Sequence, residues 1–576
     1  MIGNSGLLVG LATDGTPLRI FGPRIDSPDH LAHYEIGELW SDGAHPVPLG
    51  GHGAVAYQQR VGPGTIETRI VAQDQSRAVR IVDACERDRD IWWRSVTFEG
   101  ATPQDLVVRV RMTIDGRSYG NGVRYEPGPG AVVFHGPSLV LTLRTDPVPV
   151  GVAVEGRGDM APVPVAIPED CCTLGDVAAS LRIPARDGVR MALGIGQYRE
   201  RIGVTTDPVW SVDTQPADPV APHIEVLRML SDRHHGGILA SPEFDPYFER
   251  SGGYGYVWAR DGVYVAEALR EAGQWEACRS FYLDWAVRAQ DDGGLWGQRH
   301  HTDGQLAPTW GRQIDETGAV LWGIGQLVGS SAIGISAWRR LWPVVARGAQ
   351  GLLKRYDMTT GLIHPSLDLW EERYGAWTYS MVAVWAGLLA AARVADHLGE
   401  PGGAYQLAAD ALHDTIVEQM WSEEDGRFLR GRLPDGTADR AVDASLLGLS
   451  TPFDFLPLDD PRIVATTRAV ERELWEDGIG GLRRYNGDGY AGGHPWAVTT
   501  LWLAWDRARR GDLAGAEALM RWAREHSTSA GLLPEQVDRT TGEPAWAVPL
   551  AWSHAMYVLA SLTLERRLAE TMAAVD

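Results

Sequence analysis

The sequence predicts two domains, an antiparallel β-sandwich followed by an all-α domain whose helices close on themselves. Three observations predict this fold class. The chain of 576 residues exceeds the roughly 250 to 300 residues over which a single hydrophobic core keeps growing. Its apolar pattern changes near residue 205 from a period of two to helical spacing. Of the 23 tryptophans, only Trp40, Trp92 and Trp93 precede that change.

Residues 1–205 form the predicted β-sandwich. Short apolar runs such as DLVVRVRMTI and SLVLTLR alternate with polar residues and are separated by Gly, Pro and Asp turn signals. A period of two is typical of antiparallel strands. Many such strands with almost no helical segment predict two packed antiparallel sheets.

Residues 206–221 form the predicted linker, and residues 222–576 form the predicted helical domain. The linker contains several prolines, whereas later stretches such as YSMVAVWAGLLAAARVADHL have apolar residues at helical spacing. We expect about twelve helices, joined alternately by short and long connections. An even number of antiparallel helices buries its apolar faces best as two concentric rings, so we expect a closed double ring.

The composition limits which binding partners and which cellular compartment we expect for this protein. The formal net charge of -22 at pH 7 and the lack of a basic stripe argue against a nucleic-acid partner. We expect no membrane partner, because no stretch reaches the roughly 20 apolar residues of a membrane span. The four cysteines show neither disulfide nor zinc spacing, and the N-terminus has no basic region of a signal peptide. These features predict a cytoplasmic protein.

Five polar or aromatic clusters each stand just before a predicted helix or at its start. In a ring whose inner helices all run one way, the segments before those helices converge on one end. Taken singly, Arg260 with Asp261 is typical of a capping or surface pair, and Glu371 with Glu372 of a solvated helix start. The coincidence of Glu, Arg, Asp and Trp in five matched positions favours a carbohydrate site. The clusters are GGYGYVWARDG (252–262), APTWGRQIDETG (307–318), HPSLDLWEERYG (364–375), LRRYNGDGYAGGHPW (482–496) and GLLPEQVDRTTG (531–542).

These clusters carry a resemblance to a known family. DLWEERYG resembles the acid-bearing segment of glycoside hydrolase family 15, the family of glucoamylases, glucodextranases and related trehalases. PEQVD with the following LAWSHA resembles the base segment of that family. YGYVWARD, TWGRQIDETG and RRYNGDGYAGGHPW resemble three further segments, and the resemblance runs over nearly the whole chain. It implies an (α/α)6 barrel preceded by a β-sandwich.

The resemblance also implies roles for particular residues. Glu371 becomes the general acid, and Glu535 becomes the general base that activates water. Arg260, Asp261 and Arg484 would hold hydroxyls of the nonreducing glucose. The other implied positions are Tyr254 beside the water and the base, Trp258, Trp310 and Trp370 as pocket walls, Glu372 against the leaving sugar, and Arg312 and Trp552 as further substrate contacts. One departure follows Arg312, where the chain continues Gln313-Ile314-Asp315-Glu316 and fungal glucoamylases have a Pro.

The implied activity is that of an inverting, exo-acting α-glucosidase of the glucoamylase type. It would release β-glucose from the nonreducing ends of α-linked gluco-oligosaccharides. In inverting enzymes two carboxyls stand about 6.5 to 9.5 Å apart, and a water between them attacks the sugar. Glu371 must stay protonated near neutral pH, and we expect Trp370 and neighbouring carboxylates to raise its pKa. Glu535 must stay ionised.

Other interpretations stay open at the level of sequence. The bond cleaved could be α-1,6, as in a glucodextranase or isomaltose hydrolase, or that of trehalose. An inverting phosphorylase would use phosphate where this chain has Glu535, and a non-catalytic carbohydrate-binding protein could keep the same fold. No metal or other cofactor is expected, because the five clusters lack His and carboxylate ligand spacing and the adjacent His300 and His301 suit one metal poorly.

Overall fold

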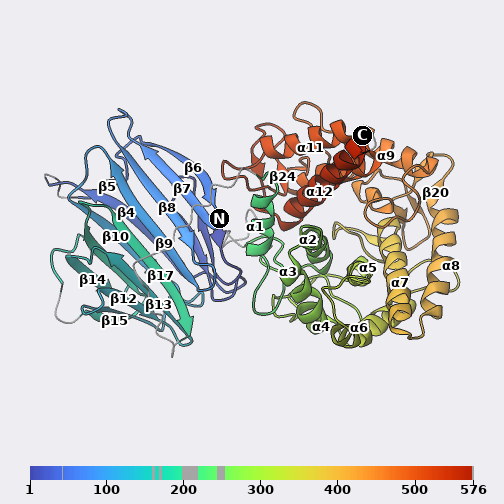
Figure 1. Cartoon of the computed structure of the whole chain (residues 1–576), viewed down its shortest axis with the longest axis horizontal. Coiled ribbons are helices and arrows are strands. Elements are labelled where there is room, and N and C mark those ends of the chain that lie inside the picture. The colour runs from blue at the N-terminus through green and yellow to red at the C-terminus, as the bar shows by residue number, and fades with distance from the viewer. Residues whose placement is uncertain are drawn as a thin grey trace. The chain divides into compact units, whose positions relative to one another are not determined.

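The computed structural model describes residues 1–41, 43, 45–158, 163–167, 171–197, 218–242 and 253–573. The chain divides into two compact units, Met1–Asp218 and Pro219–Asp576 (Figure 1). Of the predicted linker, residues 206–217 lie outside the described residues.

The first unit consists of antiparallel strands. They are β1 (Ile2–Gly3), β2 (Leu8–Leu11), β3 (Pro17–Phe21), β4 (Leu31–Leu39), β5 (Val47–Pro48), β6 (Val55–Gly62), β7 (Thr65–Val71), β8 (Ala78–Cys85), β9 (Ile91–Glu99), β10 (Asp105–Met112), β11 (Asn121–Glu126), β12 (Ala131–His135), β13 (Leu139–Asp146), β14 (Gly151–Glu155), β15 (Cys172–Gly175), β16 (Ala178–Pro184) and β17 (Val189–Gln197). One sheet has nine strands in the order β15-β11-β12-β13-β17-β9-β8-β7-β6, and a second has five in the order β14-β16-β10-β4-β5. A smaller sheet joins β1, β2 and β3.

The two large sheets pack face to face around the core of this unit. Tyr34 on β4 and Trp92 on β9 belong to different sheets, and their ring centroids lie 6.3 Å apart. Along β13 the alternate residues Leu139, Leu141 and Leu143 are buried, as a strand with one face on a core requires. The predicted antiparallel β-sandwich is thereby confirmed.

The second unit is helical. Its helices are α1 (Ala221–Met229), α2 (Ala259–Glu271), α3 (Trp275–Ser280), η1 (Phe281–Trp285), α4 (Ala286–Ala289), α5 (Ile314–Gln326), α6 (Ile335–Leu353), α7 (Thr378–Leu398), α8 (Gly403–Met420), η2 (Ala444–Leu449), α9 (Pro461–Leu474), η3 (Tyr490–Gly492), α10 (Ala497–Arg510), α11 (Leu513–Glu525) and α12 (Ala551–Ala573). Short strands in its loops are β18 (Ser366–Leu367), β19 (Tyr374–Trp377), β20 (Trp421–Ser422), β21 (Arg427–Phe428), β22 (Gly431–Arg432), β23 (Ala438–Asp439), β24 (Gln536–Val537) and β25 (Pro544–Ala545).

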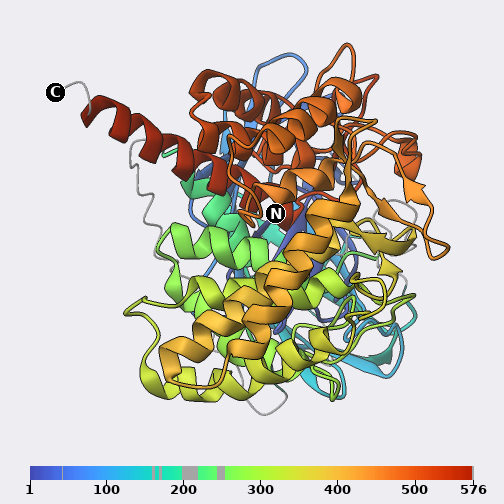
Figure 2. The ribbon, with the colours of Figure 1, turned by 90° about the vertical axis from the view of Figure 1, so that its right-hand side faces the viewer.

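The helices form the expected double ring (Figures 1 and 2). Helices α2, α5, α7, η2, α10 and α12 each contact the next, and α12 contacts α2, so the inner ring is closed. Helix α1, the continuous run from α3 through η1 to α4, and helices α6, α8, α9 and α11 pack against this inner ring. The fourth inner position is the six-residue 3₁₀ helix η2, which is too short for helical spacing to reveal it in the sequence.

Two inner helices approach each other closely through glycines. A Cβ atom on Gly318 of α5 would lie 2.4 Å from the backbone carbonyl of Ala383 on α7, and one on Gly387 would lie 2.7 Å from the carbonyl oxygen of Gly318. Helix α5 is buried on every side from Ile314 to Gly325. The close contact between α5 and α7 is therefore possible because Gly318 and Gly387 have no side chain.

Helix α7 corrects one expectation drawn from the sequence. Residues Thr378–Leu398 are long and apolar enough to cross a membrane by length and composition alone, with a mean hydropathy of 1.4. In the structure 78% of this apolar stretch is buried inside the helical unit, since α7 is a member of the inner ring. Burial on nearly all faces explains its apolar composition.

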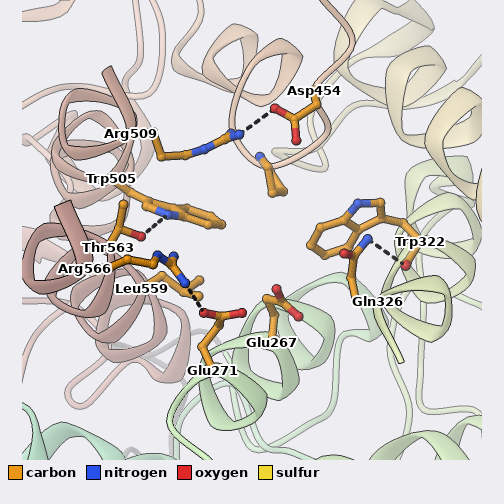
Figure 3. Close-up of a pocket in the computed structure, with 11 residues that line it drawn as sticks. Glu267, Glu271, Trp322, Gln326, Asp454, Trp505, Arg509, Leu559, Thr563 and Arg566 are labelled. Carbon is orange, nitrogen blue, oxygen red and sulfur yellow. Dashed lines mark hydrogen bonds and ion pairs between the residues drawn. The ribbon is translucent and has the colours of Figure 1, made fainter. Parts of the chain in front are cut away.

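A cavity of about 160 Å³ lies at the C-terminal ends of the inner helices (Figure 3). Trp322 and Trp505 line it, and two ion pairs lie at its wall, Arg566 with Glu271 at 3.0 Å and Arg509 with Asp454 at 2.5 Å. The five clusters singled out in the sequence lie at the other ends of these helices. Helix α2 has 13 residues, so the two ends of the ring are about 20 Å apart along it.

Candidate active site

The loops before the inner helices meet at one end of the ring and are joined by backbone bridges. Apart from Gly252, which lies outside the described residues, all five clusters are found there. Isolated β-bridges join Val257 to His300, Leu482 to Trp496, and Trp496 to Gln536. On the last inner helix, the Ser553 hydroxyl donates to the carbonyl oxygen of Pro534 at 2.7 Å. These bonds hold loops that are distant in sequence in one fixed arrangement.

Glu371 is contacted by three side chains from two other segments of the chain. The Trp258 indole donates a hydrogen bond to Oε1 at 2.5 Å, and the Gln298 amide donates to Oε2 at 2.7 Å. A guanidinium nitrogen of Arg260 lies 3.9 Å from Oε1. The side chain keeps 16% of its surface exposed, so it faces an accessible space in the unliganded protein.

Burial raises the pKa of Glu371 to about 7. Arg260 and the hydrogen bonds from Trp258 and Gln298 oppose this shift, while the nearby carboxylate of Asp261 adds to it. The sequence predicted this shift from burial beside Trp370 and from neighbouring carboxylates, and in the structure burial is the main cause and Asp261 is the contributing carboxylate. The Trp370 indole N–H donates to Asp443 at 3.0 Å.

The backbone of Glu371 is in the left-handed region, with φ at 69°. A side chain in this region carries strain of about 1 to 3 kcal/mol and persists only where surrounding contacts impose it. Here the Glu371 N–H donates to the Asp368 carbonyl at 3.0 Å, and the N–H groups of Glu372 and Arg373 donate to the Asp368 carboxylate at 2.8 and 3.2 Å. Because the turn is tight, the adjacent carboxylates of Glu371 and Glu372 point apart and accept hydrogen bonds from different side chains.

Glu535 is almost fully buried on the neighbouring side of the site. The Tyr254 hydroxyl donates to Oε1 at 2.5 Å, and the Gln536 amide donates to Oε2 at 3.0 Å. The ring of Tyr254 lies 5.9 Å from that of Trp258, which is the residue bonded to Glu371. The two glutamates therefore lie at the same end of the ring, each bonded to one of two adjacent aromatic side chains.

Burial also raises the pKa of Glu535 to about 7. The hydrogen bonds from Tyr254 and Gln536 and the charge of Arg484 favour its ionised form and limit the shift, whereas Asp261 adds to it. A general base must be ionised, and these three groups are the ones that favour the ionised form of Glu535.

Arg260 and Asp261 stand in the first turn of the inner helix α2. Arg260 is buried and pairs with Asp315 at 3.0 Å and with Glu316 at 3.1 Å. Its guanidinium carbon lies 5.7 Å from the ring of Trp552. Asp315 and Glu316, which follow Arg312 closely in the chain, are thus the two acids that anchor Arg260.

Asp261 keeps an accessible side chain beside Arg260. Its carboxylate lies 3.5 Å from the Arg260 guanidinium, and 11% of the side chain is exposed. Burial raises its pKa to about 6, although Arg260 opposes the shift. A buried carboxylate beside a guanidinium can accept hydrogen bonds from hydroxyl groups of a ligand that enters the site.

Arg484 lies on the other side of the site, among aromatic rings. It pairs with Glu372 at 2.8 Å and with Asp488 at 2.7 Å. The Tyr485 hydroxyl also donates to Glu372. The guanidinium carbon lies between 4.8 and 5.4 Å from the rings of Trp370, Tyr485, Tyr490 and Trp496. Such contacts fix the charge and the plane of the guanidinium.

Two predicted site residues lie at the margin. Trp310 is 56% exposed, and its indole donates to the backbone carbonyl of Glu371 at 3.4 Å, so it forms the rim beside the acid-bearing turn. Arg312 is exposed and pairs with Asp291 at 3.4 Å. The structure brings the other predicted residues together around the two glutamates and leaves Arg312 with Asp291.

Several residues of the site are not predicted from the sequence. Gln298, which bonds to Glu371, lies in the loop before α5 and carries no motif. A sixth loop, before η2, supplies Arg430 and Asp443 to the structure behind the acid-bearing turn. An Arg- and Asp-rich run, RGRLPDGTADRAVD, marks this loop, but no recognisable helix follows it. Among the described residues, no group of three or more His, Cys, Asp or Glu side chains is placed to hold a metal ion.

The match to a protein family falls in the helical unit. The model of glycosyl hydrolases family 15 matches residues 218–514 and 513–562. An uncharacterized glycosyl hydrolase of Methanocaldococcus jannaschii is 32% identical over 352 residues, which are 58% of this chain and 54% of that protein. The isomaltose glucohydrolase of Kribbella flavida is 29% identical over 358 residues, which are 56% of this chain and 87% of that enzyme. The match thus spans about half of the first relative.

One solved structure is similar over both units. A bacterial glucoamylase in complex with acarbose superposes with a TM-score of 0.79 and covers 98% of this chain and 93% of its own. The sequences are 18% identical. At this level of identity the likeness establishes a common fold and leaves the chemistry to be argued from the site.

Proposed function

Because this chain belongs to glycosyl hydrolases family 15, we propose that it is a glycoside hydrolase that removes glucose from the nonreducing ends of α-glucosides with inversion. The observation that carries the proposal is the pair of glutamates at one end of the helical ring, Glu535 buried and Glu371 partly exposed. Glu371 and Glu535 come from different loops, each has a pKa raised to about 7, and their hydrogen-bond donors Trp258 and Tyr254 are neighbours. Inverting hydrolysis requires one protonated and one ionised carboxyl.

In the proposed reaction Glu371 is the general acid and Glu535 is the general base. Glu371 gives its proton to the departing oxygen while the bond from that oxygen to C1 of the glucose breaks. Glu535 takes a proton from a water, and the water oxygen bonds to C1 from the opposite face. The product from an α-glucoside is then β-glucose. Tyr254, bonded to Glu535 at 2.5 Å, would orient the base toward that water.

Arg260, Asp261 and Arg484 are the proposed contacts of the terminal glucose. The two arginines are buried and held by carboxylates, and Asp261 keeps an accessible side chain. A site with such fixed polar groups can select the hydroxyls of a terminal sugar. Trp310 and Glu372, beside the acid, are the proposed contacts of the leaving sugar. This arrangement supports exo action.

An α-1,6 bond is the second candidate for the bond cleaved. The similarity to isomaltose glucohydrolase covers 87% of that enzyme, and this favours a short α-1,6-linked substrate over starch. The α-1,4 and α-1,6 linkages are therefore the two candidate bonds, and the bond of trehalose is a weaker candidate.

A substrate panel tests the proposal. The protein is incubated with maltose, maltotriose, isomaltose, trehalose and dextran, with and without phosphate, and the sugars released are quantified. We expect glucose from at least one α-glucan fragment without phosphate, and no release from Glu371→Gln or Glu535→Gln in protein that folds normally. Sugar phosphate formed only when phosphate is present would indicate a phosphorylase. Lack of turnover on every sugar would contradict the proposed activity.

A further inference from the structure

A buried arginine on the sixth loop lies behind the acid-bearing turn. Arg430 stands between β21 and β22 and is 3% exposed. Its guanidinium pairs with Asp368 at 2.6 Å and with Asp443 at 2.8 Å. The carbonyl of Arg430 accepts a hydrogen bond from the N–H of Thr378 at 3.0 Å, at the start of α7. Its position is thus fixed by its backbone as well as by its two ion pairs.

Each partner of Arg430 holds a residue next to Glu371 in the chain. Asp368 accepts the N–H groups that close the turn around Glu371. Asp443 accepts the indole N–H of Trp370 at 3.0 Å. Tyr485, whose ring lies 4.3 Å from the Arg430 guanidinium, donates its hydroxyl to Glu372. Arg430 therefore connects to three positions around the proposed acid without appearing among the contacts of Glu371 itself.

The electrostatics of this cluster call for an explanation. Burying a guanidinium and two carboxylates carries a large desolvation penalty, and apolar residues of the same size often stabilise a fold as well or better. Glu371 meanwhile adopts a left-handed backbone conformation that its surroundings must impose. A rigid ion cluster directly behind a strained turn supplies that restraint.

We propose that Arg430, anchored by Asp443, is a positioning residue that holds the Asp368 turn and thereby keeps the Glu371 carboxyl in place to protonate the leaving oxygen. This inference rests on the proposed function. It assigns to the loop before η2 a role in acid catalysis that is exerted through another residue.

The test compares two substrates with different needs for an acid. One is the α-glucoside that the wild-type protein cleaves best, and the other is α-glucosyl fluoride, whose fluoride leaves without full protonation. The variant is Arg430→Lys, which keeps the charge and loses the planar two-sided contact. The matched control is Arg440→Lys, because Arg440 lies in the same loop as Arg430 and pairs with Asp425 at 2.6 Å, but its side chain is 46% exposed.

We expect Arg430→Lys to lower kcat on the α-glucoside by about 10²-fold, the low end of what a general acid contributes, with little change in KM. The kcat on α-glucosyl fluoride should fall by less than about 10-fold. The alkaline limb of the pH profile should move to lower pH, because a released turn exposes Glu371 to water and lowers its pKa. The control should match the wild type on both substrates.

Equal losses on both substrates, or no loss on either, would overturn the inference. Asp443→Asn, which keeps the size of the side chain and an acceptor for Trp370, is measured in the same way in case Arg430→Lys does not fold. Unfolding of both variants would also contradict it, since the cluster would then support the fold and not the acid. Failure of the proposed function is distinguishable, because in that case the wild-type protein itself hydrolyses neither substrate.

Discussion

The two central glutamates have similar environments but need opposite protonation states. Burial raises the pKa of both side chains to about 7. In the productive form Glu371 holds its proton and Glu535 has lost its own. The productive form therefore requires a pH at which one carboxyl is protonated and the other is not. The polar partners of each residue, Trp258 and Gln298 for Glu371 and Tyr254 and Gln536 for Glu535, then set which carboxyl keeps its proton.

Activity should depend on pH through a bell-shaped curve centred near 7. It falls at lower pH as Glu535 gains a proton and at higher pH as Glu371 loses one. Tyr254→Phe removes the hydroxyl that donates to Glu535 at 2.5 Å, which raises the pKa of Glu535 and moves the acid limb to higher pH. Profiles of kcat/KM for the wild type and the variant measure the shift.

Tyr282→Phe is the control for this prediction, because the buried Tyr282 hydroxyl has no hydrogen-bond partner among the described residues. Its profile should overlay that of the wild type. An unchanged acid limb in Tyr254→Phe would show that this hydroxyl does not tune the base.

Buried carboxyls should also make stability depend on pH. The pKa of Glu535 rises from 4.5 to about 7 on folding. A raised pKa favours the folded state fully below the unfolded value and loses that contribution as pH rises through the folded value. Glu535→Gln cannot ionise and so does not lose this contribution. Between pH 4.5 and 8 the free energy of unfolding of the variant should therefore rise by up to about 3 kcal/mol relative to that of the wild type. Thermal unfolding at both pH values measures it, and an identical difference at the two would contradict the assignment.

At the scale of elements, close contacts between neighbouring helices form the inner ring, and these helices position the loops that precede them. The helices and five of the six loops could be predicted from the sequence, because long apolar stretches with helical spacing mark each inner helix except η2. The loop before η2 could not, since six residues of 3₁₀ helix carry no periodic signal. Gln298 and the Asp443 contact to Trp370 depend on which loops meet in space, and local sequence does not encode that.

The contact between α5 and α7 should be sensitive to a single methyl group. Gly318→Ala places a Cβ 2.4 Å from the backbone carbonyl of Ala383, so the helices must separate at a cost of about 1 to 3 kcal/mol. Both helices lead directly from site loops, and activity should fall with stability. Gly403→Ala at the start of α8, where a Cβ meets nothing within 4 Å, should be neutral or slightly stabilising. Urea unfolding measures the free energy of unfolding of the two variants. Equal values for both would contradict the close contact between α5 and α7.

At the scale of the whole molecule, the parallel direction of the inner helices separates two kinds of surface in the helical unit. The ends where these helices begin gather the carboxylates, arginines and exposed tryptophan of the candidate site. The ends where they finish line the small cavity between Trp322 and Trp505. Both the β-sandwich and the closed ring follow from the two apolar periods of the sequence, and the common end of the loops follows from the ring.

The anomeric form of the first product tests the central claim most directly. Proton NMR during the first minutes of hydrolysis, before the sugar mutarotates, distinguishes the two anomers of glucose. Water activated by Glu535 on the face opposite Glu371 predicts β-glucose first, with the α anomer appearing later by mutarotation. Initial α-glucose would mean a double displacement through a covalent intermediate, and the roles assigned here to the two glutamates would be wrong.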